Sequence, residues 1–103
     1  MNTMQILTEA IATRTPVTAI YHDRRRVFCP HVVGHKDGKP KALMLQTAGD
    51  SERGLNSDPS KNWRCLFLHE ISAVATSPTD SWQTPDNWSV ERQTCVDEVV
   101  ASI

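Results

Sequence analysis

The sequence lacks a long apolar run. No stretch of the 103-residue chain approaches the ~20 apolar residues that a membrane-spanning helix needs. The first residues also lack the basic start and the apolar segment of a secretion signal. We therefore expect a cytoplasmic protein that makes no contact with a membrane.

Cysteine and glycine are both scarce. The three cysteines, Cys29, Cys65 and Cys95, are odd in number and show no C-x-x-C spacing, which predicts reduced thiols rather than a disulfide framework. The four glycines are dispersed, so the sequence contains no glycine-rich phosphate loop. No glycine-flanked cysteine or serine marks a nucleophile, and we predict a protein that is not an enzyme and uses no cofactor.

Neither sign of charge is in excess. Eleven Lys and Arg stand against twelve Asp and Glu, so the formal net charge is −1 and no overall field attracts nucleic acid. The charges are nevertheless distributed unevenly, because Arg24, Arg25 and Arg26 are consecutive and lysines follow closely, whereas the last third is acidic. Any anion-binding site is therefore expected in the first half of the chain.

The composition is that of a globular domain, with 39% hydrophobic and 22% charged residues. We expect one domain over residues 1–103, with its core at about 4–76. Met4, Leu7 and Ile11 recur at helical spacing and predict a helix over 4–13, which Thr3 would cap and Pro16 would end. Alternating and β-branched residues predict strands near 17–21, 26–34, 41–48, 63–68 and 71–74. The dipeptide Asp37-Gly38 predicts a hairpin turn.

The rest of the chain is expected to be less regular. Residues 49–62 are rich in turn formers and predict a loop, whose role the sequence does not define. Residues 77–88 contain two prolines and two tryptophans and predict an extended segment wrapped over the domain. Ser89 is expected to be an N-cap, and the apolar stripe after it predicts a terminal helix. The stripe comprises Cys95, Val96, Val99, Val100 and Ile103. The predicted class is mainly β with flanking helices (α+β).

The order of several motifs between about residues 6 and 75 resembles the WYL family. These motifs are the opening helix, Pro16-Val17 leading to Tyr21, the run from Arg26 to His31, Asp37-Gly38, Trp63-Arg64, and the trio Leu66, Leu68 and Ile71. The resemblance implies a small SH3-like or Sm-like antiparallel barrel that senses a ligand in transcription regulation. The Trp-Tyr-Leu tripeptide itself is absent, and Phe67 and Glu70 stand where the family often has basic residues.

The family's arginines and tyrosine imply a groove for a nucleotide, a nucleic-acid end or another anion. The candidate ligand-binding residues are Tyr21, Arg24, Arg26, His31 and Arg64. Guanidinium groups beside an aromatic ring suit phosphate recognition, although a solvated turn is the simpler interpretation of the arginines. Too little chain precedes residue 4 for the helix-turn-helix that usually comes before this domain. We therefore expect a lone module that acts through a protein partner or as a homodimer.

Three alternatives stay open. The first is a protein-interaction or dimerisation adaptor that uses an open sheet edge and an apolar patch around Trp82 and Trp88. The second is a direct binder of single-stranded nucleic acid. The third is a metal site, for which the potential ligands are Cys29, His31, His35, Cys65 and His69. Their spacing is unusual for zinc, so we predict buried thiols and no metal.

Overall fold

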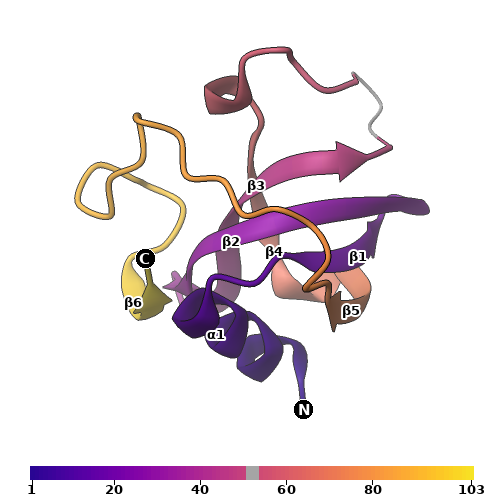
Figure 1. Cartoon of the computed structure of the whole chain (residues 1–103). Helices are drawn as coiled ribbons and strands as arrows, with labels where there is room; N and C mark the ends of the chain where they lie inside the picture. Colours follow the sequence, from indigo (N-terminus) through magenta and orange to yellow (C-terminus); the bar gives the residue numbers. More distant parts are fainter. Residues whose placement is uncertain (51–53) are drawn as a thin grey trace.

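The computed structural model describes residues 1–50 and 54–103 and arranges them as one α-helix and six antiparallel strands (Figure 1). The helix α1 spans Thr3–Thr13. The strands are β1 Val17–Tyr21, β2 Arg24–Lys36, β3 Lys39–Gly49, β4 Trp63–Phe67, β5 Ile71–Thr76 and β6 Glu98–Ser102. Two 3₁₀ turns, η1 Pro59–Lys61 and η2 Leu68–Glu70, flank β4. None of the described helices is long and apolar enough to span a membrane.

Helix α1 begins one residue before the predicted start. Asn2, not Thr3, is the N-cap: its side chain accepts from the Gln5 backbone N–H, and the Gln5 side chain accepts from the Asn2 backbone N–H. This reciprocal pair satisfies two backbone donors that the first turn would otherwise leave unpaired. The helix then buries Leu7, Ala10 and Ile11 against the sheet.

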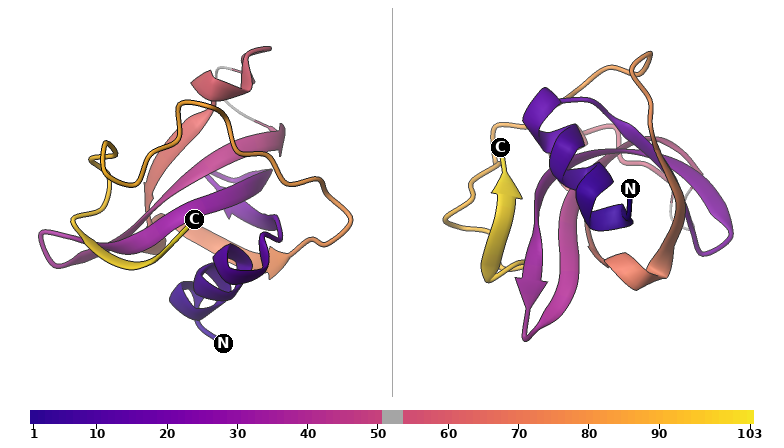
Figure 2. Two further views of the ribbon diagram at one scale, coloured as in Figure 1. Left: turned by 60° about the vertical axis from the view of Figure 1, so that its left-hand side comes forward. Right: turned by 90° about the horizontal axis from the view of Figure 1, so that it is seen from below.

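The long strand β2 organises the sheet. The strand order is β4-β3-β2-β1-β5, and β6 also pairs with β2. The first part of β2, Arg24–Phe28, pairs with β1, whereas its later part, residues 32–35, pairs with β6. Figure 2 shows α1 lying against this sheet, with β6 beside the far end of β2. The main core lies between α1 and the sheet and centres on Leu7, Phe28 and Met44.

The predicted SH3-like or Sm-like barrel is wrong, because the sheet does not close. Strands β4 and β5 lie at the two ends of the strand order, and no pairing joins them within the described residues. The turn η2 redirects the chain between these strands. The Phe67 backbone N–H at the end of β4 donates to Glu70 Oε1 instead of to a neighbouring strand, at 3.4 Å. The fold is therefore a helix packed on an open antiparallel sheet.

The predicted terminal helix is also wrong. Residues 89–97 contain no helix or strand, and Glu98–Ser102 is a strand that pairs with β2. The helical spacing of the apolar stripe was misleading, because only Cys95 and Val96 of that stripe are buried, where they pack on Val32. The β-branched pair Val99 and Val100 instead lies in the strand, where its residues are about half exposed, at 47% and 51%.

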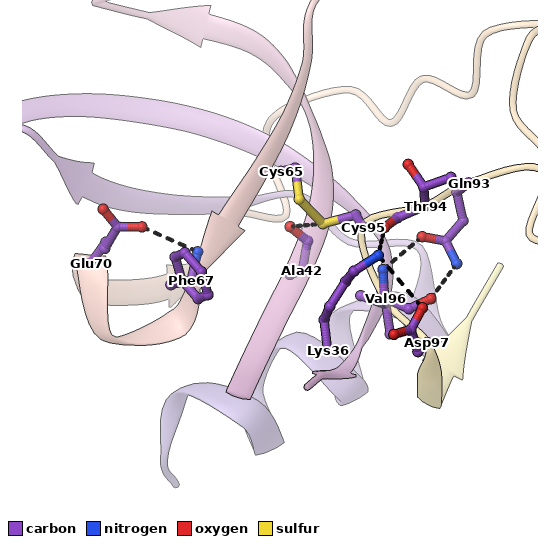
Figure 3. Close-up of a disulfide and its surroundings, with 10 residues drawn as sticks. All are labelled: Lys36, Ala42, Cys65, Phe67, Glu70, Gln93, Thr94, Cys95, Val96 and Asp97. Atoms are coloured by element: carbon purple, nitrogen blue, oxygen red, sulfur yellow. Dashed lines mark hydrogen bonds and ion pairs between the residues drawn. A yellow bond between two sulfur atoms is a disulfide. The ribbon is translucent and has the colours of Figure 1, made fainter. Parts of the chain in front are cut away.

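The cysteines differ from the prediction of reduced thiols. Cys65 of β4 and Cys95 form a disulfide with a Cα–Cα distance of 5.8 Å (Figure 3). Cys29 is the free cysteine, and it is buried. The disulfide attaches the irregular segment between β5 and β6, residues 77–97, to the sheet. The two cysteines are 30 residues apart in the sequence, so local patterns do not indicate that they pair.

Candidate functional site

A cleft of about 620 Å³ lies alongside β4. The turn between β1 and β2, the start of β2, and the segment leading into β4 form its other walls. Its described lining residues are Tyr21, His22, Arg26, Gly54, Leu55, Asn56, Lys61, Asn62, Trp63, Arg64, Cys65 and Leu66. These twelve residues include three cationic side chains and one histidine but no aspartate or glutamate, so the described part of the lining carries positive charge.

Arg26 is the most deeply placed cation of the cleft, only 3% exposed. Its Nη2 donates to Tyr21 O at 3.2 Å, and its Nη1 makes a long hydrogen bond to Gln46 Oε1 at 3.4 Å. Its Cζ lies 4.8 Å from the centroid of the Tyr21 ring. Its Nε is buried with no hydrogen-bond partner. The guanidinium has five N–H donors but makes only these two hydrogen bonds within the described residues. No described carboxylate forms an ion pair with it.

Gln46 positions Arg26 and was not found from the sequence. Its side chain is buried, and its Nε2 donates to the backbone oxygens of Ala48 and Asp50 at 3.2 and 2.8 Å. This arrangement points Oε1 at Arg26. The only sequence signal was a polar residue inside the apolar run of the third predicted strand, which marks a buried amide that needs partners.

The structure brings together three of the five predicted ligand-binding residues: Tyr21, Arg26 and Arg64 line the cleft. Arg24 does not, because it forms an ion pair with Asp50 at 3.0 Å. His31 does not either, because it is fully buried under the tryptophans of the chain. The lining residues Lys61, Asn62 and His22 belong to no sequence motif and were not predicted.

His31 anchors the 77–97 segment to β2. Its Nδ1 lies 2.8 Å from Cys29 O, and a carbonyl only accepts, so Nδ1 carries the proton and Nε2 accepts from Thr84 Oγ1 at 2.9 Å. Thr84 Oγ1 in turn accepts from Trp82 Nε1 at 2.9 Å. The ring centroids of Trp63, Trp82 and Trp88 lie 4.8, 5.0 and 5.1 Å from that of His31. Burial lowers the pKa of His31.

This histidine makes the stability depend on pH. The pKa of His31 is lower in the folded protein than its unfolded value of about 6.5, so the unfolded chain binds more protons. Its contribution to stability is complete above about pH 6.5 and is lost as the pH falls, at up to about 1.4 kcal/mol per pH unit. Urea unfolding between about pH 5 and pH 7.5 measures this slope. We expect His31→Gln to flatten it and the exposed control His69→Gln to leave it unchanged; equal slopes in all three proteins would contradict the assignment.

The potential metal ligands do not converge. Cys65 is bonded to Cys95, both ring nitrogens of His31 have partners, and His69 stacks on Phe67. Burial raises the pKa of the Cys29 thiol, which disfavours the thiolate that a metal needs. No group of three or more potential ligands exists within the described residues.

A second cavity of about 500 Å³ adjoins the cleft and shares Trp63 and Cys65 with it. Its described lining residues are Lys41, Leu43, Trp63, Cys65, Asn87, Trp88, Ser89, Arg92, Gln93, Thr94 and Cys95. This lining again contains cations but no carboxylate. Trp63 Nε1 donates to Asn87 Oδ1 at 3.1 Å and joins β4 to the 77–97 segment at this point.

Two features on which the adaptor alternative was based, the tryptophan patch and an open sheet edge, are partly covered at Trp82, Trp88 and β4. The tryptophans Trp82 and Trp88 are half-buried and contact His31, and they are not among the exposed large apolar side chains of the described residues. The outer edge of β4 is partly blocked by its own side chains: Trp63 O accepts from Arg64 Nη1, and Phe67 N–H donates to Glu70. Groups occupied in this way are not available to an added strand.

Comparison with known proteins adds no family assignment. The resemblance to WYL domains, drawn from the order of the sequence motifs, stays a prediction. No family model matches the chain, and neither a curated protein nor a solved structure does.

Proposed function

We propose that the protein is a non-enzymatic binding module that takes up an anionic ligand, such as a nucleotide or a nucleic-acid end, in the cleft beside β4. The observation that carries this proposal is Arg26, a buried guanidinium without a described carboxylate partner. A buried charge that lacks a counter-ion is costly, and a bound anion would offset that cost.

The surrounding residues support the same ligand class. Lys61 and Arg64 supply further positive charge, and Tyr21 and Trp63 supply aromatic faces for a planar group. A volume of about 620 Å³ is in the usual range for small-molecule sites. The described lining contains no carboxylate base, and its one cysteine is in a disulfide, which favours binding over catalysis.

Replacement of Arg26 by methionine tests the proposal. Methionine keeps much of the apolar stem but removes the charge and the donors. Isothermal titration at low ionic strength with pyrophosphate and with adenosine triphosphate is expected to show an affinity loss of roughly tenfold to a hundredfold, the value of a charged hydrogen bond. Arg25, the exposed neighbour on β2, provides the matched control Arg25→Met, which should bind as the wild type does.

This function is contradicted if neither probe binds the wild type. It is also contradicted if Arg26→Met binds the probes as tightly as the wild type does while its near-ultraviolet circular dichroism, which reports on the fold, is unchanged. The variant Arg26→Lys separates charge from geometry. It should recover part of the affinity for pyrophosphate, because an ammonium supplies the charge without the planar fork.

The second candidate function is binding of single-stranded nucleic acid, and the second cavity favours it. Lys41, Arg92 and Trp88 continue the basic and aromatic lining past Trp63. An oligothymidylate in the same titrations distinguishes the two functions. If the ligand spans both cavities, the double variant Lys41→Ala with Arg92→Ala should bind oligothymidylate more weakly and pyrophosphate as tightly as the wild type does. The affinity for the oligonucleotide should also fall steeply as the salt concentration rises.

A further inference from the structure

The Cys65–Cys95 disulfide lies where the cleft and the second cavity meet. Cys65 lines both spaces, and Cys95 lines the second one. Cys65 is exposed, whereas Cys95 is 5% exposed. An incoming thiolate therefore reaches the Cys65 sulfur from the cavities, with Cys95 as the leaving group.

The disulfide joins two parts of the chain that have few other attachments to each other. On one side, β4 is an end strand that pairs with β3 and carries Trp63 and Arg64 of the cleft. On the other side, residues 77–97 contain no strand or helix. The described noncovalent links between them are few: Trp63 bonds to Asn87 and packs on Trp88, whose ring centroid is 5.6 Å away.

The same segment has separate anchors on β2. Thr84 bonds to His31, and Lys36 Nζ donates to Thr94 O at 2.8 Å and lies 3.6 Å from Asp97 (Figure 3). Strand β6 follows and pairs with β2. Opening of the disulfide therefore weakens the attachment of β4 to the segment, which then rests on the Trp63 contacts, while the segment stays on the domain. This is the arrangement required for a local change without unfolding.

We propose that the Cys65–Cys95 disulfide is a thiol–disulfide exchange site that controls the anion affinity of the cleft. The reductant is a dithiol. Its first thiolate forms a mixed disulfide with Cys65 and expels Cys95, which takes up a proton. Its second thiol then displaces Cys65 as a thiol and leaves as a cyclic disulfide, so two electrons pass to the protein.

The consequence for the ligand rests on the proposed function. In the oxidised protein, β4 is held from both sides, so Arg64 and Trp63 keep their places in the cleft wall. In the reduced protein, the covalent link is gone, and among the described contacts only the bond of Trp63 to Asn87 and its packing on Trp88 still join β4 to the segment. The cleft then loses preorganisation, and anion affinity falls.

The test compares oxidised and dithiol-reduced protein in the Cys29→Ala background, where no third thiol is present. Intact mass and alkylation of Cys65 and Cys95 establish the redox state. We expect the Kd for pyrophosphate to rise at least about fivefold on reduction, and acrylamide quenching of tryptophan fluorescence to increase. The double variant Cys65→Ala with Cys95→Ala should behave as the reduced form and not respond to dithiol.

The two readouts separate this proposal from the proposed function. If the oxidised protein binds no pyrophosphate, the proposed function fails, and so does the control of anion affinity. Tryptophan quenching still shows in that case whether exchange opens the segment. If the disulfide resists dithiol in the folded protein, or if the Kd is unchanged on complete reduction, the exchange site is rejected while anion binding by the oxidised protein still stands.

Discussion

Reduction of the Cys65–Cys95 disulfide is expected to lower the free energy of unfolding by about 3.5 kcal/mol. The disulfide closes a loop with a sequence separation of 30 residues. Opening this loop gives the unfolded chain more conformations, and the chain-entropy estimate grows with loop length. The folded state keeps the His31, Lys36 and β6 contacts of the segment, so most of the effect arises in the unfolded chain.

Urea unfolding of the wild type with and without dithiol measures this difference. A change of this size should lower the melting temperature by on the order of 15 °C in a domain of about 100 residues. Cys29→Ala is the matched control, because it removes a buried thiol that is not in the disulfide and should keep the full response to dithiol. A difference below about 1 kcal/mol would indicate that the unfolded chain is compact around this loop even without the bond.

Local patterns were enough to predict helix α1 and the approximate positions of strands β1 to β5. The helix was correct to one residue at its start, because its apolar spacing and Pro16 are local signals. The hairpin between β2 and β3 is present at Asp37 and Gly38, which both have positive φ values of 51° and 77°. Aspartate and glycine tolerate this conformation better than most residues, so turn chemistry alone located the hairpin.

Apart from the N-cap of α1, the errors involve contacts between distant parts of the chain. Whether β4 meets β5 depends on the path of η2, and the pairing of Cys65 depends on where the 77–97 segment lies. The stripe from Cys95 to Ile103 fits helical spacing, yet β2 offers a free edge to which Glu98–Ser102 adds as a strand. A single sequence does not reveal that edge, so the helical spacing of the apolar residues led to the prediction of a helix.

The candidate site shows the same division between local features, which the sequence predicts, and long-range packing, which it does not. Tyr21 and Arg26 flank the same turn, so their proximity followed from the hairpin between β1 and β2. The burial of Arg26 did not, because it depends on Gln46 and on the close approach of Gly49. His31 lies elsewhere because the tryptophans of a distant segment cover it. Strand alternation gives the direction of a side chain but not what packs over it.

Replacement of Gly34 by alanine is expected to destabilise the protein by about 3 kcal/mol or more, through sterics alone. A Cβ at this position would lie 1.9 Å from Glu98 O, 2.7 Å from Val96 Cγ1 and 2.9 Å from Glu98 C. Two of these atoms belong to the backbone of β6, which cannot rotate away. Strand β6 must therefore shift from β2, and the cluster of Val32, Cys95 and Val96 would lose its packing.

Gly38→Ala is the matched control for this substitution. Nothing lies within 4 Å of a Cβ at Gly38, but its φ of +77° makes alanine strained, at a cost of about 1 to 2 kcal/mol. Urea unfolding gives the two losses, and hydrogen exchange of the Val99 and Ala101 amides reports whether β6 has left β2. An effect no larger than that of Gly38→Ala, with β6 still protected, would show that β6 adapts to the added methyl group. Faster exchange confined to β6 would instead show that this strand is held by its fit against Gly34, because its own valines are about half exposed and add little burial.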